Sequence, residues 1–413
     1  MQSYAPSRPT STVYGSPVHA DDDLTPSSDD EPGKGKGRKK KRRRFLPTDP
    51  GWAKTLLIVG AVLMIVSGIS GGIVVTGRLA LAYATKDIKQ EDLIPEELKA
   101  AGKNIDGELN ILLLGLDERK NSDAAIRTDS IIIIHVPKAH DNVYLISLPR
   151  DTKVDIPAMP DFNYPGRSNA KLTEVYQVGN QKNGKPDDSE AGRKRGVTAT
   201  ARVISKLVPG GIRFNAVAII NYNGFKKLVE ALGGVKMCID QVVKSEHYDA
   251  KGKYHTSTSR EGVSQYTYKP GCRNMKAWEA LDYARQREGL PNGDYDRQRH
   301  QQQLLRAIFS KLLSKGTLTD VSQFSALQKA AGDLLTLDLG KVKIEDWLFS
   351  FKHLNESNIV MIKTNGGTYA SQTINGLSYQ ILNEDSVDLL RAVKEDTVYE
   401  FLTKHPNWIA KTK

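Results

Sequence analysis

Aspartate and arginine residues border three short apolar runs: Asp117 follows 109–116, Asp129 precedes 130–136, and Pro149-Arg150-Asp151 follows 143–148. If the three runs form an antiparallel meander, these polar residues meet at one edge of a sheet. Two neighbouring carboxylates suit a hard cation such as Mg²⁺, which keeps water and phosphate oxygens as its other ligands. We therefore interpret Asp117 and Asp129 as candidate metal ligands. The alternative is that they are solvated residues near turns.

A second polar cluster lies between two predicted helices. Arg285 and Arg287 end one helix, and Asp294 occupies an N-cap position before another, on which Arg297 and Gln301 are i, i+4 neighbours. The planar fork of arginine suits bidentate contacts to phosphate oxygens, and a helix N-terminus adds backbone donors. Several arginines converging on a carboxylate pair suit a pyrophosphate. The alternative is a salt-bridged helix N-terminus.

The spacing of apolar residues, which differs between strands and helices, predicts the elements that position these residues. The predicted strands are 109–116, 130–136, 143–148, 217–221 and 235–239, and the predicted helices are 170–178, 197–207, 223–232, 276–285 and 297–313. Continuously apolar strands indicate a sheet covered on both faces, as in a layered α/β domain. The polar stretches 181–195 and 244–269 are predicted to be long surface loops.

The N-terminal part predicts a membrane anchor. Residues 1–53 have the composition of a disordered tail, and 55–77 are 23 consecutive uncharged residues, which as a helix would span about 34 Å. The basic run 34–44 precedes them and predicts a cytoplasmic N-terminus. We therefore expect a cytoplasmic tail (1–53), a single transmembrane signal anchor (54–78) and a juxtamembrane linker (79–104). A cleavable signal peptide and a twin-arginine export signal are the alternatives.

Composition and charge limit the function classes. The chain has 413 residues, a net charge of +11 and only two cysteines, which excludes a four-cysteine zinc site and a disulfide-framework mini-domain. The charge indicates acidic partners such as nucleic acid, anionic lipid or phosphates. A basic run beside an apolar span is typical of membrane topology, so we expect no nucleic acid partner. Outside the cell, Cys238 and Cys272 would form a structural disulfide, the alternative being two unpaired buried thiols.

Five motifs in order resemble the LytR-CpsA-Psr family. They are Asn110-Ile-Leu-Leu-Leu-Gly-Leu-Asp117, Arg127-Thr-Asp-Ser130, Ser147-Leu-Pro-Arg-Asp151, Phe225 through Gly233-Gly-Val235, and Ala280-Leu-Asp-Tyr-Ala-Arg-Gln-Arg287 followed by Asp294-x-x-Arg297. The resemblance runs from about residue 105 to 395. It implies an extracellular α/β/α catalytic domain with a central mixed sheet over 105–395, and leaves a short C-terminal segment, 396–413.

The resemblance implies a glycopolymer ligase of the Gram-positive cell envelope. Such an enzyme transfers a glycopolymer with its phosphate from undecaprenyl pyrophosphate to peptidoglycan. Asp117 and Asp129 would then hold Mg²⁺, and Arg150, Arg285, Arg287 and Arg297 would clamp the pyrophosphate with Gln301 assisting. Asp294 would orient an arginine or accept the proton of the attacking hydroxyl. The lipid would lie in an apolar tunnel whose lining the sequence does not identify.

Two features of the sequence differ from the family pattern or leave it undefined, and three other functions are possible alternatives. The family motif usually has arginine before the glutamine, where this chain has His300, and the stretch 244–269 leaves acceptor recognition undefined. The competing functions are a non-catalytic polyprenyl-phosphate-binding protein, a polyprenyl pyrophosphatase and a transcriptional regulator. The anchor and an outward-facing domain argue against the regulator, and a carboxylate pair favours chemistry over simple anion capture.

Overall fold

The computed structural model describes residues 90–100, 105–118, 124–255, 263–313, 335–340, 342–343, 346–347, 350–351 and 353–410. All of them belong to the second of the two units into which the chain divides, Ile65–Lys413. No helix among these residues has the length and apolarity needed to cross a membrane. The predicted tail (1–53) and signal anchor (54–78) lie outside the described residues.

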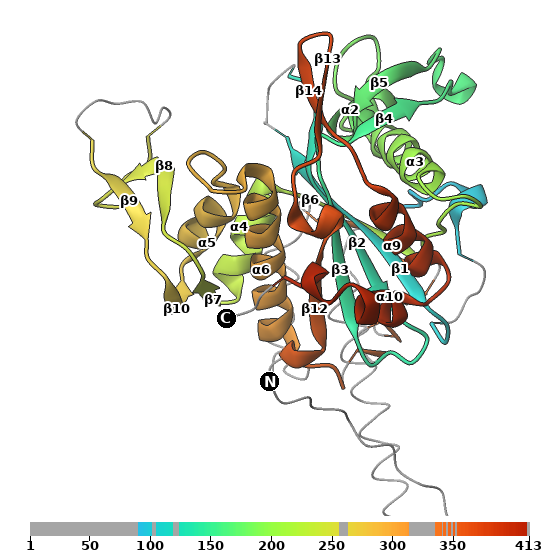
Figure 1. Cartoon of the computed structure of the whole chain (residues 1–413). Coiled ribbons are helices and arrows are strands. Elements are labelled where there is room, and N and C mark those ends of the chain that lie inside the picture. The colour runs from blue at the N-terminus through green and yellow to red at the C-terminus, as the bar shows by residue number, and fades with distance from the viewer. Residues whose placement is uncertain are drawn as a thin grey trace, which may run out of the picture. The chain divides into compact units, whose positions relative to one another are not determined.

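A six-stranded mixed sheet forms the centre of the described part (Figure 1), with the order β11-β6-β1-β2-β3-β12. Its strands are β1 (Leu109–Asp117), β2 (Arg127–Val136), β3 (Val143–Leu148), β6 (Ala216–Asn221), β11 (Leu335–Asp338) and β12 (Ile359–Lys363). The first three form the predicted antiparallel meander. Strand β6 runs parallel to β1, and β12 runs parallel to β3. The predicted α/β class with a central mixed sheet is therefore confirmed.

Helices cover both faces of this sheet. On one face lie α2 (Leu172–Asn180), α3 (Glu190–Lys206), α9 (Glu384–Lys394) and α10 (Val398–Lys404), and on the other lie α4 (Tyr222–Ala231) and α6 (Gly293–Leu313), with α5 (Ala277–Arg285) packed against these two helices. Side chains of β1 alternate between two hydrophobic clusters, with Leu112 packed toward the first group and Leu113 toward the second. Burial on both faces explains the continuous apolarity of the strands.

Shorter elements complete the described part. Four two-stranded pairs are β4 (Lys153–Ile156) with β5 (Arg167–Lys171), β7 (Val235–Ile239) with β10 (Gly271–Met275), β8 (Val243–Asp249) with β9 (Gln265–Tyr268), and β13 (Ser371–Ile374) with β14 (Leu377–Gln380). The 3₁₀ turns are Glu96–Leu98, Pro160–Phe162, Glu356–Asn358, Thr364–Gly367 and Pro406–Trp408. Cys238 and Cys272 lie opposite each other on β7 and β10 and form the expected disulfide.

Both predicted long loops contain regular structure. Helix α3 begins at Glu190, within the predicted loop 181–195, because the Ser189 side chain caps it by accepting from the Gly192 backbone N–H over 3.1 Å. The stretch 244–269 contains most of β8 and all of β9. Polar composition hid both elements, since each has an exposed face. Helix α10 lies in the C-terminal segment 396–413, and its Phe401 is buried in the main core.

Candidate active site

A β-bulge brings the two candidate metal ligands to the same face of the sheet. Gly115 pairs with Ser130 but Leu116 pairs with Thr128, so Asp129 is an extra residue in β2. In a regular strand, side chains alternate between the two faces, so Asp129 would lie on the face opposite Ile132. The bulge instead places Asp129 on the same face as Ile132, where a cavity lies. A β-carbon on Gly115 would approach Cβ of Ser130 to 2.9 Å, so the strands meet closely here.

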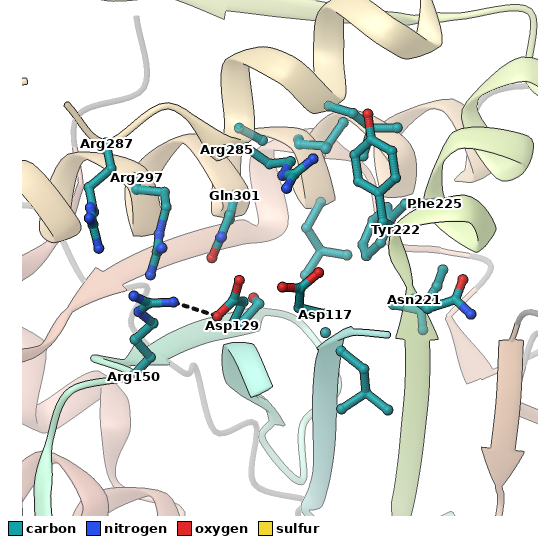
Figure 2. Close-up of a pocket in the computed structure, with 18 of the residues that line it drawn as sticks. Asp117, Asp129, Arg150, Asn221, Tyr222, Phe225, Arg285, Arg287, Arg297 and Gln301 are labelled. Atoms are coloured by element: carbon teal, nitrogen blue, oxygen red, sulfur yellow. Dashed lines mark hydrogen bonds and ion pairs between the residues drawn. The ribbon is translucent and has the colours of Figure 1, made fainter. Parts of the chain in front are cut away.

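Both aspartates lie within strands, and not beside them as predicted. Asp117 is the last residue of β1, and Asp129 is the third residue of β2. Both are partly buried and both line one cavity. Figure 2 shows the two side chains pointing into that cavity from neighbouring strands. The predicted meeting of the carboxylates at one sheet edge is therefore present in the structure.

Arg150 follows β3 and reaches the same edge. Its Nη1 donates to Oδ1 of Asp129 over 2.6 Å, and its Nε lies 3.8 Å from Oδ2 of Asp151. Burial is the largest single effect and lowers the pKa of Arg150, but the charge and hydrogen bond of Asp129, together with the charges of Asp151 and Asp294, raise the pKa overall. The guanidinium is therefore a permanent positive charge beside the carboxylates.

Arg285 and Arg287 come from the end of α5 and lie at the exposed rim of the cavity. The Arg285 guanidinium lies over the ring of Tyr222, 4.6 Å from its centroid, which is a cation–π contact. Arg287 pairs with the neighbouring Glu288, with 2.9 Å between Nη2 and Oε1. An exposed pair of this kind holds the side chain only weakly, so Arg287 can turn toward an anion.

Arg297 is held rigidly in the first turns of α6. Its side chain is only 7% exposed and forms an ion pair with Asp294, one turn earlier. Burial and the neighbouring Arg150 lower the pKa of Arg297, and Asp294 acts in the opposite direction. Among the described residues, no acceptor takes a hydrogen bond from its Nε. Arg297 thus offers a buried and unused donor in the cavity wall.

Asp294 supports Arg297 from behind and does not line the cavity. Its Oδ2 accepts from Nε2 of Gln298 over 2.9 Å, and its backbone N–H donates to the Tyr369 hydroxyl over 2.6 Å. Nothing in the sequence pointed to Tyr369, which lies 75 residues further along the chain. The ion pair with Arg297 and the bond from Gln298 hold the carboxylate in place, which is the geometry expected of the orienting role.

One cavity of about 270 Å³ is lined by all the predicted metal and phosphate ligands, with Asp294 behind its wall. Its polar lining includes Asp117, Asp129, Arg150, Arg285, Arg287, Arg297 and Gln301, from five separate chain segments (Figure 2). Its apolar lining includes Leu113, Leu116, Ile132, Ile220, Phe225, Leu281, Leu304 and Leu305. The cavity can therefore receive a molecule with an anionic group and a hydrocarbon part.

Further lining residues were not predicted. Asn221 and Tyr222 end β6 and begin α4, and Glu246 and His247 lie on β8. Since β6 is parallel to β1, the strand ends of both reach the same sheet edge, and this register was the available signal for Asn221 and Tyr222. No comparable signal marked Glu246 and His247, because their strand was taken for a loop.

His300 lies outside the cavity lining. It is completely buried and stacks on Tyr283, with ring centroids 4.2 Å apart. Burial lowers its pKa to about 4, and the charge of Arg299 acts in the same direction. The residue is therefore neutral at ordinary pH and contributes no charge to the rim.

Comparison with known proteins identifies relatives in the bacterial cell envelope. The chain is 28% identical to the cell wall biosynthesis protein LcpA of Corynebacterium glutamicum, with 58% of this chain and 46% of LcpA covered. It is 29% identical to the polyisoprenyl-teichoic acid–peptidoglycan teichoic acid transferase TagU of Bacillus cereus, covering 56% and 61%. The chain thus matches about half the length of the first relative and three fifths of the second. TagU of Oceanobacillus iheyensis is 24% identical over 84% of this chain and 93% of its own.

Solved structures share the fold. TagV of Bacillus subtilis matches with a TM-score of 0.51 at 17% identity, covering 71% of this chain and 98% of TagV. A protein from Streptococcus agalactiae matches with a TM-score of 0.52 at 21% identity, covering 70% and 88%. The model of the LytR_cpsA_psr family matches residues 73–395, which include every residue of the cavity described above. The chain therefore belongs to the LytR_cpsA_psr family.

Proposed function

We propose that this chain is a membrane-anchored phosphotransferase that attaches a glycopolymer, carried on undecaprenyl pyrophosphate, to peptidoglycan. One observation carries the proposal: a single cavity joins four arginines and two carboxylates to an apolar wall. A polyprenyl pyrophosphate has the same division into anionic head and hydrocarbon chain. The teichoic acid transferases and the cell wall biosynthesis protein among its relatives support this substrate class.

The arginines would bind the pyrophosphate from several directions. Arg150 and Arg297 are held in place by Asp129 and Asp294, whereas Arg285 and Arg287 lie at the exposed rim. Gln301, one turn after Arg297 on the same face of α6, adds an amide to the lining. Charges fixed before the substrate arrives stabilise the transition state without reorganisation. Asp294 would act only as a positioning residue for Arg297.

The donor set fits Mg²⁺ as the cofactor. Asp117 and Asp129 offer two carboxylates at the cavity wall, and the described residues contain no cluster of three or more His, Cys, Asp and Glu side chains able to cage a metal. Mg²⁺ is commonly bound through one or two carboxylates and completes its shell with water and phosphate oxygens. When bound, the ion would neutralise charge on the pyrophosphate oxygens.

The transfer is a single displacement at phosphorus. The acceptor hydroxyl oxygen forms a bond to the phosphorus that bears the sugar, and the bond from that phosphorus to the bridging oxygen breaks. Undecaprenyl phosphate leaves with the bridging oxygen and its electron pair, and the hydroxyl proton passes to water at the cavity mouth. Asp294 is assigned the orienting role, because its carboxylate lies behind the cavity lining and contacts Arg297 and Gln298.

We place the catalytic domain outside the cell, on one anchor with a cytoplasmic N-terminus. The Cys238–Cys272 disulfide supports an oxidising compartment. The expected partners are thus the membrane, the lipid-linked donor and the peptidoglycan acceptor.

The test is a reconstituted transfer by the full-length chain in detergent. It uses an undecaprenyl-pyrophosphate-linked oligosaccharide and peptidoglycan oligomers, with or without Mg²⁺, and product is followed by mass. We expect a glycan–phosphate–peptidoglycan adduct that requires Mg²⁺ and is lost in Asp129→Ala and Arg287→Ala. The matched controls Asp388→Ala and Arg391→Ala remove an exposed ion pair on α9 and should retain transfer.

Other outcomes would indicate another function. Donor binding without adduct would identify a lipid-binding protein. Release of a phosphorylated glycan with water as the acceptor would identify a pyrophosphatase.

A further inference from the structure

Three aromatic side chains beside the cavity have no part in the proposed transfer. Tyr248 lies on β8, Tyr254 follows the turn after β8, and Trp278 lies on α5. The ring centroids of Tyr248 lie 4.5 Å from Trp278 and 5.4 Å from Tyr254. We call these three residues the aromatic platform.

The outer ring of the platform is exposed but well supported. Tyr254 is 54% exposed, although a tyrosine ring usually gains free energy by burial. The backbone N–H of His255 donates to the His247 carbonyl over 2.7 Å, and the Asp249 carboxylate accepts from the N–H groups of Lys251 and Lys253 over 2.9 Å each. The turn therefore holds Tyr254 in an ordered, outward-facing position.

The platform adjoins the cavity directly. Glu246 and His247 line the cavity, and the His247 ring lies 5.9 Å from that of Tyr254. Tyr248 follows His247 on β8, and the cavity lining also contains Tyr222, with the Arg285 guanidinium 4.6 Å from the centroid of its ring. Aromatic side chains therefore extend outward from the arginine rim.

We propose that the aromatic platform binds the sugar rings of the donor glycan that follow the pyrophosphate. Flat aromatic faces accept the C–H faces of pyranose rings. Polar side chains stand beside them: Nε2 of His255 lies 2.9 Å from Oδ2 of Asp249, and Glu246 lies at the cavity. Such groups can bind sugar hydroxyls.

The position of the aromatic platform at the cavity mouth favours the donor glycan, and not the acceptor glycan, as its ligand. The first donor sugar is joined to the reacting phosphorus through one ester oxygen. If the arginines hold that phosphorus and the apolar wall holds the lipid, the first sugars must lie at the cavity mouth. Strand β8 contributes both to this mouth and to the platform. The inference rests on the proposed function, since it requires the pyrophosphate to bind at the arginines.

The experiment measures binding, so it does not depend on turnover. The full-length chain in detergent is titrated with undecaprenyl pyrophosphate, and separately with the same lipid bearing an N-acetylhexosamine disaccharide. Tyr254→Ala should weaken binding of the glycosylated lipid about three- to tenfold, as for loss of one aromatic contact, and leave the sugar-free lipid unchanged. Tyr254→Phe should bind as wild type. The control Tyr399→Ala removes a tyrosine of α10 that is 67% exposed and should change neither affinity.

Three results would overturn the platform. Tyr254→Ala could bind the glycosylated lipid as tightly as wild type does, or lose affinity equally for both lipids. It could also change only the KM for peptidoglycan oligomers, which would assign the platform to the acceptor. In each case the sugar-free lipid still binds the wild type, so the proposed function survives. If the wild type binds neither lipid, both proposals fail.

Discussion

Arg150 and Asp129 form an ion pair, with 2.6 Å between Nη1 and Oδ1, at the sheet edge where the proposed metal would bind. The same carboxylate would thus serve two cations, the Arg150 guanidinium and the proposed Mg²⁺. Because Asp129 is only partly buried, it keeps a second oxygen for a metal ligand. This arrangement predicts that the two cations compete for Asp129 in the absence of substrate.

Arg150→Met should distinguish the contribution of the Arg150 guanidinium from that of Mg²⁺. Transfer should fall about 10²- to 10³-fold, as for loss of one charged transition-state donor. Affinity for Mg²⁺ should stay equal or increase, because Asp129 loses its competing partner. Initial transfer rates and Mg²⁺ titration by calorimetry measure the two effects. Arg391→Met is the control, and a parallel loss of metal affinity in Arg150→Met would contradict the competition.

Asp294→Asn should destabilise the protein. It leaves the buried Arg297 without its ion-pair partner, which costs about 3–5 kcal/mol when a buried pair is broken on one side. Urea unfolding midpoints measure the change, and Asp388→Asn on the exposed pair of α9 should cost less than about 1 kcal/mol.

The double variant Asp294→Asn/Arg297→Met removes both charges of this ion pair. It should regain most of the lost stability but remain inactive, because no uncompensated charge is left and the phosphate donor is gone. A double variant that transfers glycan at the wild-type rate would rule out a role for Arg297 in the reaction.

Reduction of the Cys238–Cys272 disulfide should lower stability without changing the chemistry. The sequence separation is 34 residues, for which the chain-entropy model gives about 3–4 kcal/mol. Dithiothreitol should shift the unfolding midpoint of the wild type but not that of Cys238→Ser/Cys272→Ser. If reduced protein folds normally yet loses all transfer activity, the disulfide has a function beyond stability.

Stability should fall between pH 6.5 and pH 4 because of His300. Its folded pKa of about 4 lies below its ordinary value of 6.5, so in this window the unfolded chain binds more protons. Stability is therefore complete above pH 6.5 and decreases as pH falls, by on the order of 3 kcal/mol at the limit. The charged groups next to this ring are Asp240, Asp296 and Arg299, and each of the two carboxylates pairs with Arg299.

His300→Leu isolates this contribution. Unfolding midpoints at pH 7.5 and pH 5 should differ less in this variant than in the wild type. An unchanged difference would assign the pH dependence to other groups.

The sequence predicted the structure correctly where a polar residue lies at the end of a run of apolar residues. The first three strands, a helix over 223–232 and the sheet edge with Asp117, Asp129 and Arg150 were all predicted, because hydrophobic periodicity and chain direction determine them. Helix α4 is observed at Tyr222–Ala231 and is followed by two glycines. Gly233 and Gly234 do have positive φ, +69° and +89°, which glycine adopts at low cost.

What the sequence could not predict depends on distant packing. Asp294 was assigned two roles, and the position of its carboxylate behind the cavity lining, on Arg297 and Gln298, favours the orienting one. The apolar cavity wall combines β1, β2, β6 and three helices, so no local pattern contains it. Strand β8 was missed because polar residues alternate on its exposed face, and with it the aromatic platform was missed.

The bulge at Asp129 makes the carboxylate pair depend on the number of residues in β2 as well as on their identity. Deleting Thr128 would leave every cavity side chain in the gene but restore regular alternation, turning Asp129 away from the cavity. A one-codon deletion would thus remove the proposed metal site from a protein that still encodes Asp117 and Asp129. For this reason, the presence of both aspartates in a variant of this chain would not by itself indicate that the site is intact.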